Sequence, residues 1–97
     1  DWVQARFCEW IEVPAAPVVI LEGCASATAR IRERASVVVW VEAPVALRLA
    51  RGLDRDGDAL EAQWRGWQER ESAHFAADDT RAAANARVDG RTGRIVS

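Results

Sequence analysis

The chain of 97 residues contains no lysine, no methionine and no tyrosine. All 13 of its basic residues are therefore arginines, whose planar guanidinium groups suit carboxylates and phosphates, although a coding bias toward arginine would give the same composition. The net charge of −2 argues against a general nucleic-acid binder, which needs a surplus of positive charge. Because the chain opens on Asp1 and Trp2 without a methionine, we expect a processed N-terminus or, by preference, a part of a longer protein.

Cysteine is scarce, and long apolar runs are absent. Cys8 and Cys24 are the only cysteines, and their spacing matches no zinc signature and no CxxC pair. Neither has an obvious base partner that would make it a nucleophile, so we expect free, mostly buried thiols in a reducing cytoplasm, with a disulfide left open. No apolar run approaches the roughly 20 residues that a membrane span needs, and no signal peptide is evident. We therefore expect a cytoplasmic protein without membrane contact.

Apolar residues make up 49% of the chain and charged residues 29%, which is typical of a globular protein. The length allows one domain, over residues 1–97, with residues 91–97 as a tail. Unbroken apolar runs flanked by proline and glycine indicate buried strands. Patterning predicts strands at 18–21, 37–41 and 86–88, and helices at 1–13, 27–34, 44–53 and 59–85, the last one bent near Asp78 and Asp79. This alternation indicates an α/β domain with a parallel sheet.

Three segments in order carry a resemblance: VVILEG at 18–23, WVEAP at 40–44 and RLARGLDRD at 48–56. Together they resemble the C-terminal part of the uridine kinase-like group of P-loop kinases. Gln63 and the segment ARVDG at 86–90 fit the spacing of the lid helix and last strand in that group. The resemblance implies a partial P-loop NTPase fold and transfer of the ATP γ-phosphoryl group to the hydroxyl of a nucleoside or similar small molecule. It also implies ATP and Mg²⁺ as cofactors.

The chain departs from that family at the phosphate-binding loop. No G-x-x-x-x-G-K-[ST] motif occurs, and without lysine none is possible, so we expect the chain alone to be inactive. Asp56, Gly57 and Asp58 stand where the family's lid has a further arginine-rich turn, which leaves the phosphate acceptor open. In the family the strand with this loop lies between the two valine-rich strands. Its absence predicts a gap of about 10 Å in the sheet, unless the chain pairs differently.

The candidate site residues follow from the resemblance, each with a structural alternative. Glu22 would support magnesium or orient the substrate hydroxyl, or it is an acid facing solvent at a strand end. Arg48, Arg51 and Arg55 share a helix face and would bind the phosphoryl oxygens of the cofactor, with Arg51 and Arg55 also catalytic, or they form a solvated face paired with acids. The pair Asp1-Trp2 would lie near the nucleoside, or it only begins a helix.

Other patterns give weaker signals. Asp54, Asp56 and Asp58 suggest calcium, but glycine stands fourth in this loop where an EF-hand needs it sixth. His74 has Glu71 and Asp78 at helical spacing, yet a lone histidine makes a poor metal site. Two tryptophans, at 64 and 67, could stack a base, although aromatics at this spacing are usually core residues.

Two functional hypotheses remain. In the first, the parent protein is a kinase in which Glu22, Arg51 and Arg55 act on phosphates held elsewhere. In the second, the chain is a degenerate NTPase-like module for nucleotide sensing or protein association, possibly a homodimer, because a sheet with an unpaired edge favours association.

Overall fold

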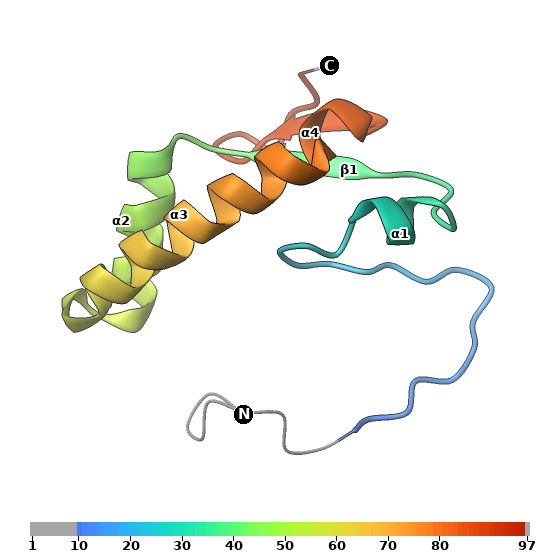
Figure 1. Ribbon diagram of the computed structural model, residues 1–97, viewed down its shortest axis with the longest axis horizontal. Coiled ribbons are helices and arrows are strands. Elements are labelled where there is room, and N and C mark those ends of the chain that lie inside the picture. The colour runs from blue at the N-terminus through green and yellow to red at the C-terminus, as the bar shows by residue number, and fades with distance from the viewer. Residues whose placement is uncertain (1–9, 97) are drawn as a thin grey trace.

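The computed structural model describes residues 10–96. Along these residues the elements follow in this order: α1 (Ala29–Arg32), β1 (Val39–Glu42), α2 (Val45–Asp56), the 3₁₀ helix η1 (Asp58–Leu60), α3 (Glu61–Asp78), α4 (Thr80–Ala83) and β2 (Ala86–Asp89). Figure 1 shows α2 and α3 as a helical hairpin that projects from the sheet, while residues 10–28 form a long irregular segment beside this body. The architecture mixes helix and strand.

The sheet consists of two parallel strands in the described part of the chain. β1 pairs with β2 from Val39–Ala86 to Glu42–Asp89, so the carboxyl ends of both strands lie at one edge. The chain leaves β1, forms the helical hairpin and returns as β2, as a parallel crossover requires. The prediction of an α/β chain with a parallel sheet is confirmed at this level, and the predicted strands at 37–41 and 86–88 correspond to β1 and β2.

The two faces of β1 have different surroundings. Side chains alternate along a strand, so Trp40 and Glu42 share one face and Val39 and Val41 the other. Trp40 packs edge-on against Phe75 of α3, with ring centroids 4.7 Å apart and an interplanar angle of 86°. Val39 and Val41 are 52% and 63% exposed. The small core therefore lies on the α3 side of the sheet.

Proline and glycine set the limits of α2. Pro44 has φ −54° and stands immediately before the first helical residue, where its missing N–H costs no hydrogen bond. At the other end Gly57 has φ +97°, a region that residues with a side chain rarely adopt, and its N–H donates to the carbonyl of Leu53. The helix predicted from residue 44 and its interruption after Asp56 are confirmed, with the end three residues later than expected.

The long helix breaks where two aspartates adjoin. α3 ends at Asp78, and Asp79 adopts a left-handed conformation with φ +58° before α4 begins. Aspartate tolerates this conformation better than most residues with a side chain. The predicted bend near Asp78 and Asp79 is confirmed.

The predicted strand at 18–21 is wrong. These residues are irregular, and Val18, Val19, Ile20 and Leu21 are 60–86% exposed. β-branched residues form a strand only when a neighbouring strand supplies hydrogen bonds. In the described sheet β1 pairs only with β2, so residues 18–21 have no neighbouring strand. The predicted helix at 27–34 is reduced to the four residues of α1. Of the helix predicted at 1–13, residues 10–13 are irregular, and residues 1–9 lie outside the described part.

The C-terminal residues expected as a tail fold back on β2. Gly93, with φ +76°, lies in the turn, and Ile95 forms an antiparallel bridge with Val88. The Val96 N–H donates to the carbonyl of Arg87 at 2.8 Å. No helix among residues 10–96 is long and apolar enough to cross a membrane.

Candidate functional site

A groove of about 760 Å³ separates β1 from residues 20–27. One wall is formed by residues 38–43, the other by residues 20–27, and α3 contributes Glu71, Ser72 and Phe75. We call this hollow the β1 groove. Ile20 and Leu21 are among the apolar residues that line it. It is the larger of the two hollows described in this section. The predicted gap between two strands is not formed, because residues 18–21 are not a strand.

Glu22 lies on the wall of the β1 groove. Its neighbour Gly23 has φ +135°, a backbone conformation that glycine adopts easily, and the turn is held by the Ser26 hydroxyl, which donates to the Gly23 carbonyl at 2.8 Å. Glu22 is exposed, and its carboxylate accepts no hydrogen bond from the described residues. It is thus available to a ligand or to solvent.

Arg48 lines the same groove but already has protein partners. Its Nη1 donates to Glu71 Oε1 at 3.0 Å and its Nε to the Ala43 carbonyl at 3.0 Å. This pair joins the first turns of α2 to the middle of α3, and Glu71 is the polar exception on an otherwise apolar helix face. Arg48 therefore positions the helical hairpin against the end of β1.

Arg51 and Arg55 lie outside the β1 groove. Arg51 Nη1 donates to the Gly90 carbonyl at 3.0 Å. Arg55 pairs with Asp56 at 3.0 Å, and its guanidinium carbon lies 5.5 Å from the ring centroid of Trp64. The structure thus brings Glu22 and Arg48 together in one groove and leaves the other two arginines on the surface of the hairpin.

The carboxyl end of β1 carries a partly exposed ion pair. Arg81 donates to both oxygens of Glu42, at 2.7 and 3.0 Å, and Trp40 Nε1 donates to Oε2 at 2.9 Å. The bonds from Arg81, with a smaller contribution from Trp40, lower the pKa of Glu42 to about 2. Glu42 is therefore a charged acceptor at neutral pH and is unsuited to donate a proton.

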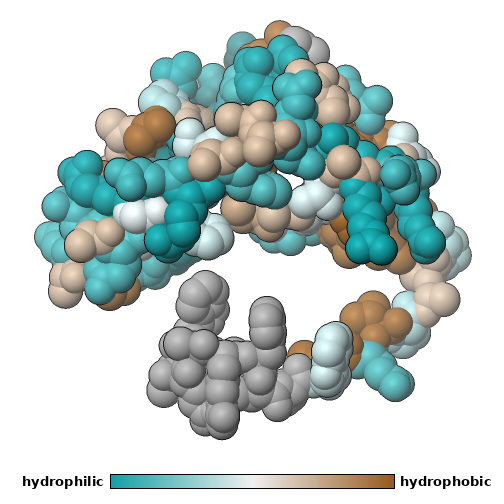
Figure 2. All heavy atoms as spheres, viewed as in Figure 1, coloured by the Kyte–Doolittle hydropathy of each residue, from teal (hydrophilic) through white to brown (hydrophobic). Residues whose placement is uncertain are grey.

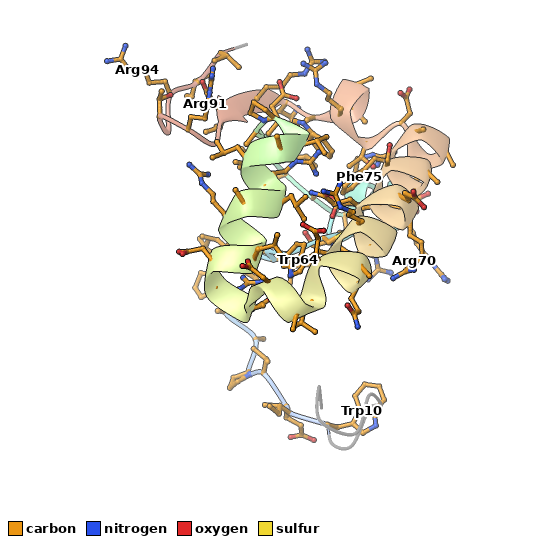
Figure 3. The ribbon with its side chains drawn as sticks, turned by 90° about the vertical axis from the view of Figure 1, so that its left-hand side faces the viewer. Trp10, Trp64, Arg70, Phe75, Arg91 and Arg94 are labelled. Atoms are coloured by element: carbon orange, nitrogen blue, oxygen red, sulfur yellow. The ribbon has the colours of Figure 1, made fainter. Side chains whose placement is uncertain are left out.

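A second, smaller hollow of about 340 Å³ lies where both strands end. It is lined by Glu42 and Asp89, which are register partners, and by Arg91 and Val96. The backbone N–H and the side chain of Arg91 bond to Asp89 and hold the pKa of that carboxyl below its usual range. In Figure 3, Arg91 and Arg94 extend outward from this end of the molecule. Each carboxylate thus has its own arginine.

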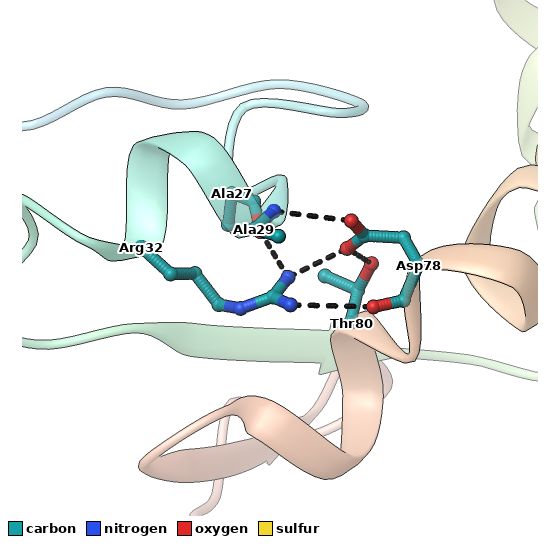
Figure 4. A network of polar contacts seen from close by, with 5 residues as sticks. All are labelled: Ala27, Ala29, Arg32, Asp78 and Thr80. Atoms are coloured by element: carbon teal, nitrogen blue, oxygen red, sulfur yellow. Dashed lines mark hydrogen bonds and ion pairs between the residues drawn. The ribbon is translucent and has the colours of Figure 1, made fainter.

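Asp78 ties α1 to the corner between α3 and α4, as Figure 4 shows. Its carboxylate accepts bonds from Arg32 Nη1 at 2.6 Å, from the Ala29 N–H at 3.0 Å and from the Thr80 hydroxyl. The Thr80 bond, then the Arg32 and Ala29 bonds, hold the pKa of Asp78 well below its usual range. Both charged side chains are largely buried, at 18% and 13% exposure. This cluster anchors the segment that leads out of the groove wall.

The weaker candidates from the sequence were the aspartate loop at 54–58, His74 and the cysteines. No group of three or more His, Cys, Asp or Glu side chains that could hold a metal ion is found within residues 10–96. His74 Nε2 is buried without a hydrogen-bond partner among the described residues. Cys24 is a free thiol on the surface, so the expectation of a buried thiol is wrong at this position. Its slight burial and, second, Glu71 raise the pKa of the thiol, which opposes formation of a nucleophilic thiolate.

The two tryptophans considered for base stacking differ. Trp64 lies against Gly52 and donates to Asp56 at 3.0 Å, and Figure 3 shows it between the helices, so it packs the hairpin. Trp67 is 41% exposed. The other predicted substrate residues, Asp1 and Trp2, and the thiol of Cys8 lie outside the described part of the chain.

Sequence reasoning did not identify Asp78, Arg32 or Arg81 as organising residues. The contacts that join these residues to other elements span 39 to 49 residues of sequence, so no local spacing indicates them. The sequence did contain a signal for the contact of Glu71, because an acid on an apolar helix face needs a partner.

Comparison of the chain with protein-family models, with curated proteins and with solved structures gives no match in any of the three.

Proposed function

We propose that this chain is the C-terminal part of an ATP-dependent small-molecule kinase, similar to nucleoside kinases, that transfers the γ-phosphoryl group to a hydroxyl. The observation that supports the proposal is the position of Glu22, which lines one groove together with the carboxyl end of β1 and Arg48. In open sheets with parallel strands, ligands bind at the carboxyl ends of the strands.

The residues in the groove suit magnesium and a hydroxyl better than they suit phosphates. Carboxylate oxygens are the ligands that Mg²⁺ prefers, and Glu22 offers two with no partner in the described residues. Of the three carboxylates that line the groove, Glu42 is paired with Arg81 and Glu71 with Arg48, so the charge of Glu22 is left over and repels a triphosphate. The described residues thus do not form a phosphate cradle, and the proposal requires that one comes from outside this chain.

In the proposed reaction, Glu22 orients the substrate hydroxyl or a magnesium-bound water by accepting its hydrogen bond. Arg48 keeps its contacts with Glu71 and Ala43 and fixes the hairpin. Arg51 and Arg55 reach a phosphate only after they leave Gly90 and Asp56, so their part in the proposal requires movement of the α2–α3 hairpin.

The test is phosphoryl transfer by the chain produced together with the coding sequence upstream of Asp1. We expect transfer from magnesium-ATP to a member of a nucleoside panel, and a loss of kcat of about 100-fold for Glu22→Gln, a typical cost of removing a positioned acid or base. Glu12→Gln is the matched control, because Glu12 is exposed and lies outside the groove. Full activity of Glu22→Gln, or no transfer to any acceptor, contradicts the proposal.

A non-catalytic module for nucleotide sensing or protein association is the second candidate. It is favoured by the edge of β1 that has no strand partner within residues 10–96, and by the exposed Val39 and Val41 beside it. Magnesium-ATP that raises the melting temperature of the 97-residue chain alone would support sensing, and it would count against a phosphate cradle located elsewhere.

A further inference from the structure

Residues 20–35, which include one wall of the β1 groove and α1, are joined to one another by local hydrogen bonds. The hydroxyl and the backbone N–H of Ser26 donate to the Gly23 carbonyl, at 2.8 and 3.3 Å. Arg32 Nη1, on α1, donates to the Ala27 carbonyl at 2.8 Å. Because these bonds connect the wall to α1, a displacement of the helix displaces the wall. We call residues 20–35 the flap.

The polar contacts between the flap and the residues that follow it all go to Asp78. Its carboxylate accepts the Ala29 N–H at 3.0 Å and Arg32 Nη1 at 2.6 Å, and its backbone carbonyl accepts Arg32 Nη2 at 3.2 Å (Figure 4). Within residues 10–96, no other hydrogen bond or ion pair joins the flap to later residues. One side chain at the end of α3 therefore carries the attachment.

Apolar contacts add little to this attachment. Ile20 and Leu21 are 86% and 63% exposed, and Ile31 of α1 is 38% exposed. In Figure 2 the irregular segment that leads to the flap carries apolar residues and curves away from the body. A segment with few buried apolar contacts opens at a low cost in free energy. The flap thus depends on Arg32 and Asp78 for its position.

Ser36 and Val37 connect the flap to β1. Both are exposed, and neither forms a hydrogen bond with other described residues. The next residue, Val38, is fixed, since its N–H donates to Asn85 Oδ1 at 2.8 Å and its carbonyl accepts the Asn85 N–H. Hinges are short segments between anchored elements that absorb a change in backbone conformation. These two residues have the position and the freedom of a hinge.

From these observations we infer that the flap is a hinged cover of the β1 groove, which the contact of Arg32 with Asp78 holds closed and which opens about Ser36 and Val37. In the closed position the flap supplies the wall opposite β1, and opening removes that wall. The groove then admits larger molecules than it does when closed. The inference needs only the groove and the Arg32–Asp78 contact, so it is independent of the proposed function.

Cys24 is a natural reporter of the position of the flap. It is exposed, and it lines the groove together with Glu71, Ser72 and Phe75 of α3. Replacement of Cys8 by serine leaves Cys24 as the only thiol of the chain. A nitroxide attached there lies on the flap, whereas the amides of Ser72 and Phe75 lie on the body, so broadening of their NMR signals reports closure.

The test compares two arginines of α1 in the labelled 97-residue chain. Arg32→Gln should reduce the broadening of the Ser72 and Phe75 signals by about half or more, because loss of one partner from a largely buried ion pair is strongly destabilising. Arg30→Gln is the matched control, since Arg30 is exposed on the same helix and its side chain forms no bond with described residues. It should retain the broadening.

Two further signals show whether the flap moves as a unit. The Cα chemical shifts of α1 should remain helical in Arg32→Gln, and the Asn85 and Gly90 amides, which bond to β1, should remain protected. Unchanged broadening in Arg32→Gln overturns the inference, and so does an equal decrease in Arg30→Gln. Loss of the helical shifts or of the protected amides also overturns it, because the wall is then lost by unfolding and not by movement about a hinge.

Discussion

At the scale of single residues, Asp78 is the side chain with the most partners in the described structure outside the sheet. It connects Arg32, Ala29 and Thr80. We predict that Asp78→Asn speeds amide exchange of Ala29 about tenfold, because the neutral amide loses the ion pair and leaves α1 free to open locally. Hydrogen exchange followed by NMR measures this effect.

Asp79→Asn is the control for that prediction. Asp79 is the next residue along the chain, and asparagine accepts its left-handed conformation equally well. The same change of charge at this position should leave Ala29 unaffected. If both variants speed exchange alike, net charge and not the Asp78 contact holds α1 in place.

Glu42 gives a prediction of pH dependence. Its pKa is lowered from 4.5 to about 2 by Arg81 and Trp40, so its contribution to stability is complete above about pH 4.5 and is lost as the pH falls toward 2. We expect urea unfolding of Glu42→Gln to show a smaller loss of stability over that range than the unsubstituted chain. Identical pH profiles for the two proteins would mean that the Glu42–Arg81 pair adds nothing to stability.

At the scale of elements, the contact between α2 and α3 depends on a glycine. A Cβ on Gly52 would lie 2.7 Å from two carbons of the Trp64 ring, a distance that requires the helices to move apart. We predict that Gly52→Ala lowers the free energy of unfolding by about 1–3 kcal/mol, the usual cost of overpacking. Urea denaturation measures it.

Gly66→Ala is the matched control on α3. The added Cβ would meet only the flexible end of Arg70, at 3.5 Å. Alanine in a helix interior should then stabilise by about 0.5–1 kcal/mol. Opposite signs for the two substitutions identify the Trp64 contact as the cause, and equal effects would exclude it.

The sequence predicted the ends of α2 and α3 well, because each end is set by the backbone preference of a single residue. Pro44 and Gly57 delimit α2, and Asp79 breaks the long helix, each for a reason contained in one residue. The prediction of a strand at 18–21 is wrong for the opposite reason. A strand needs a neighbouring strand, and the pattern of apolar residues in one segment does not show whether such a neighbour is present. The sequence likewise did not show which candidate site residues come together. Glu22 and Arg48 line one groove, whereas Arg51 bonds to Gly90 and Arg55 to Asp56 outside it.

At the scale of the whole molecule, the chain is expanded for its length. Its radius of gyration is 15.4 Å, against about 12.5 Å for a compact domain of 97 residues. The irregular segment beside the body and the projecting hairpin account for the difference in Figure 1. Among the long-range contacts, the pairing of β1 with β2 brings together the segments before and after the hairpin, and the Arg32–Asp78 pair joins α1 to the end of α3.

The tip of the α2–α3 hairpin is a suitable position for attaching a label. Asp58 is exposed beside the glycine turn, has no side-chain partner in residues 10–96 and is not among the residues lining either hollow. Exposed tips of this kind tolerate additions. A fluorophore or spin label joined to a cysteine at position 58, with Cys8 and Cys24 replaced by serine, would report on hairpin motion from a position outside both hollows.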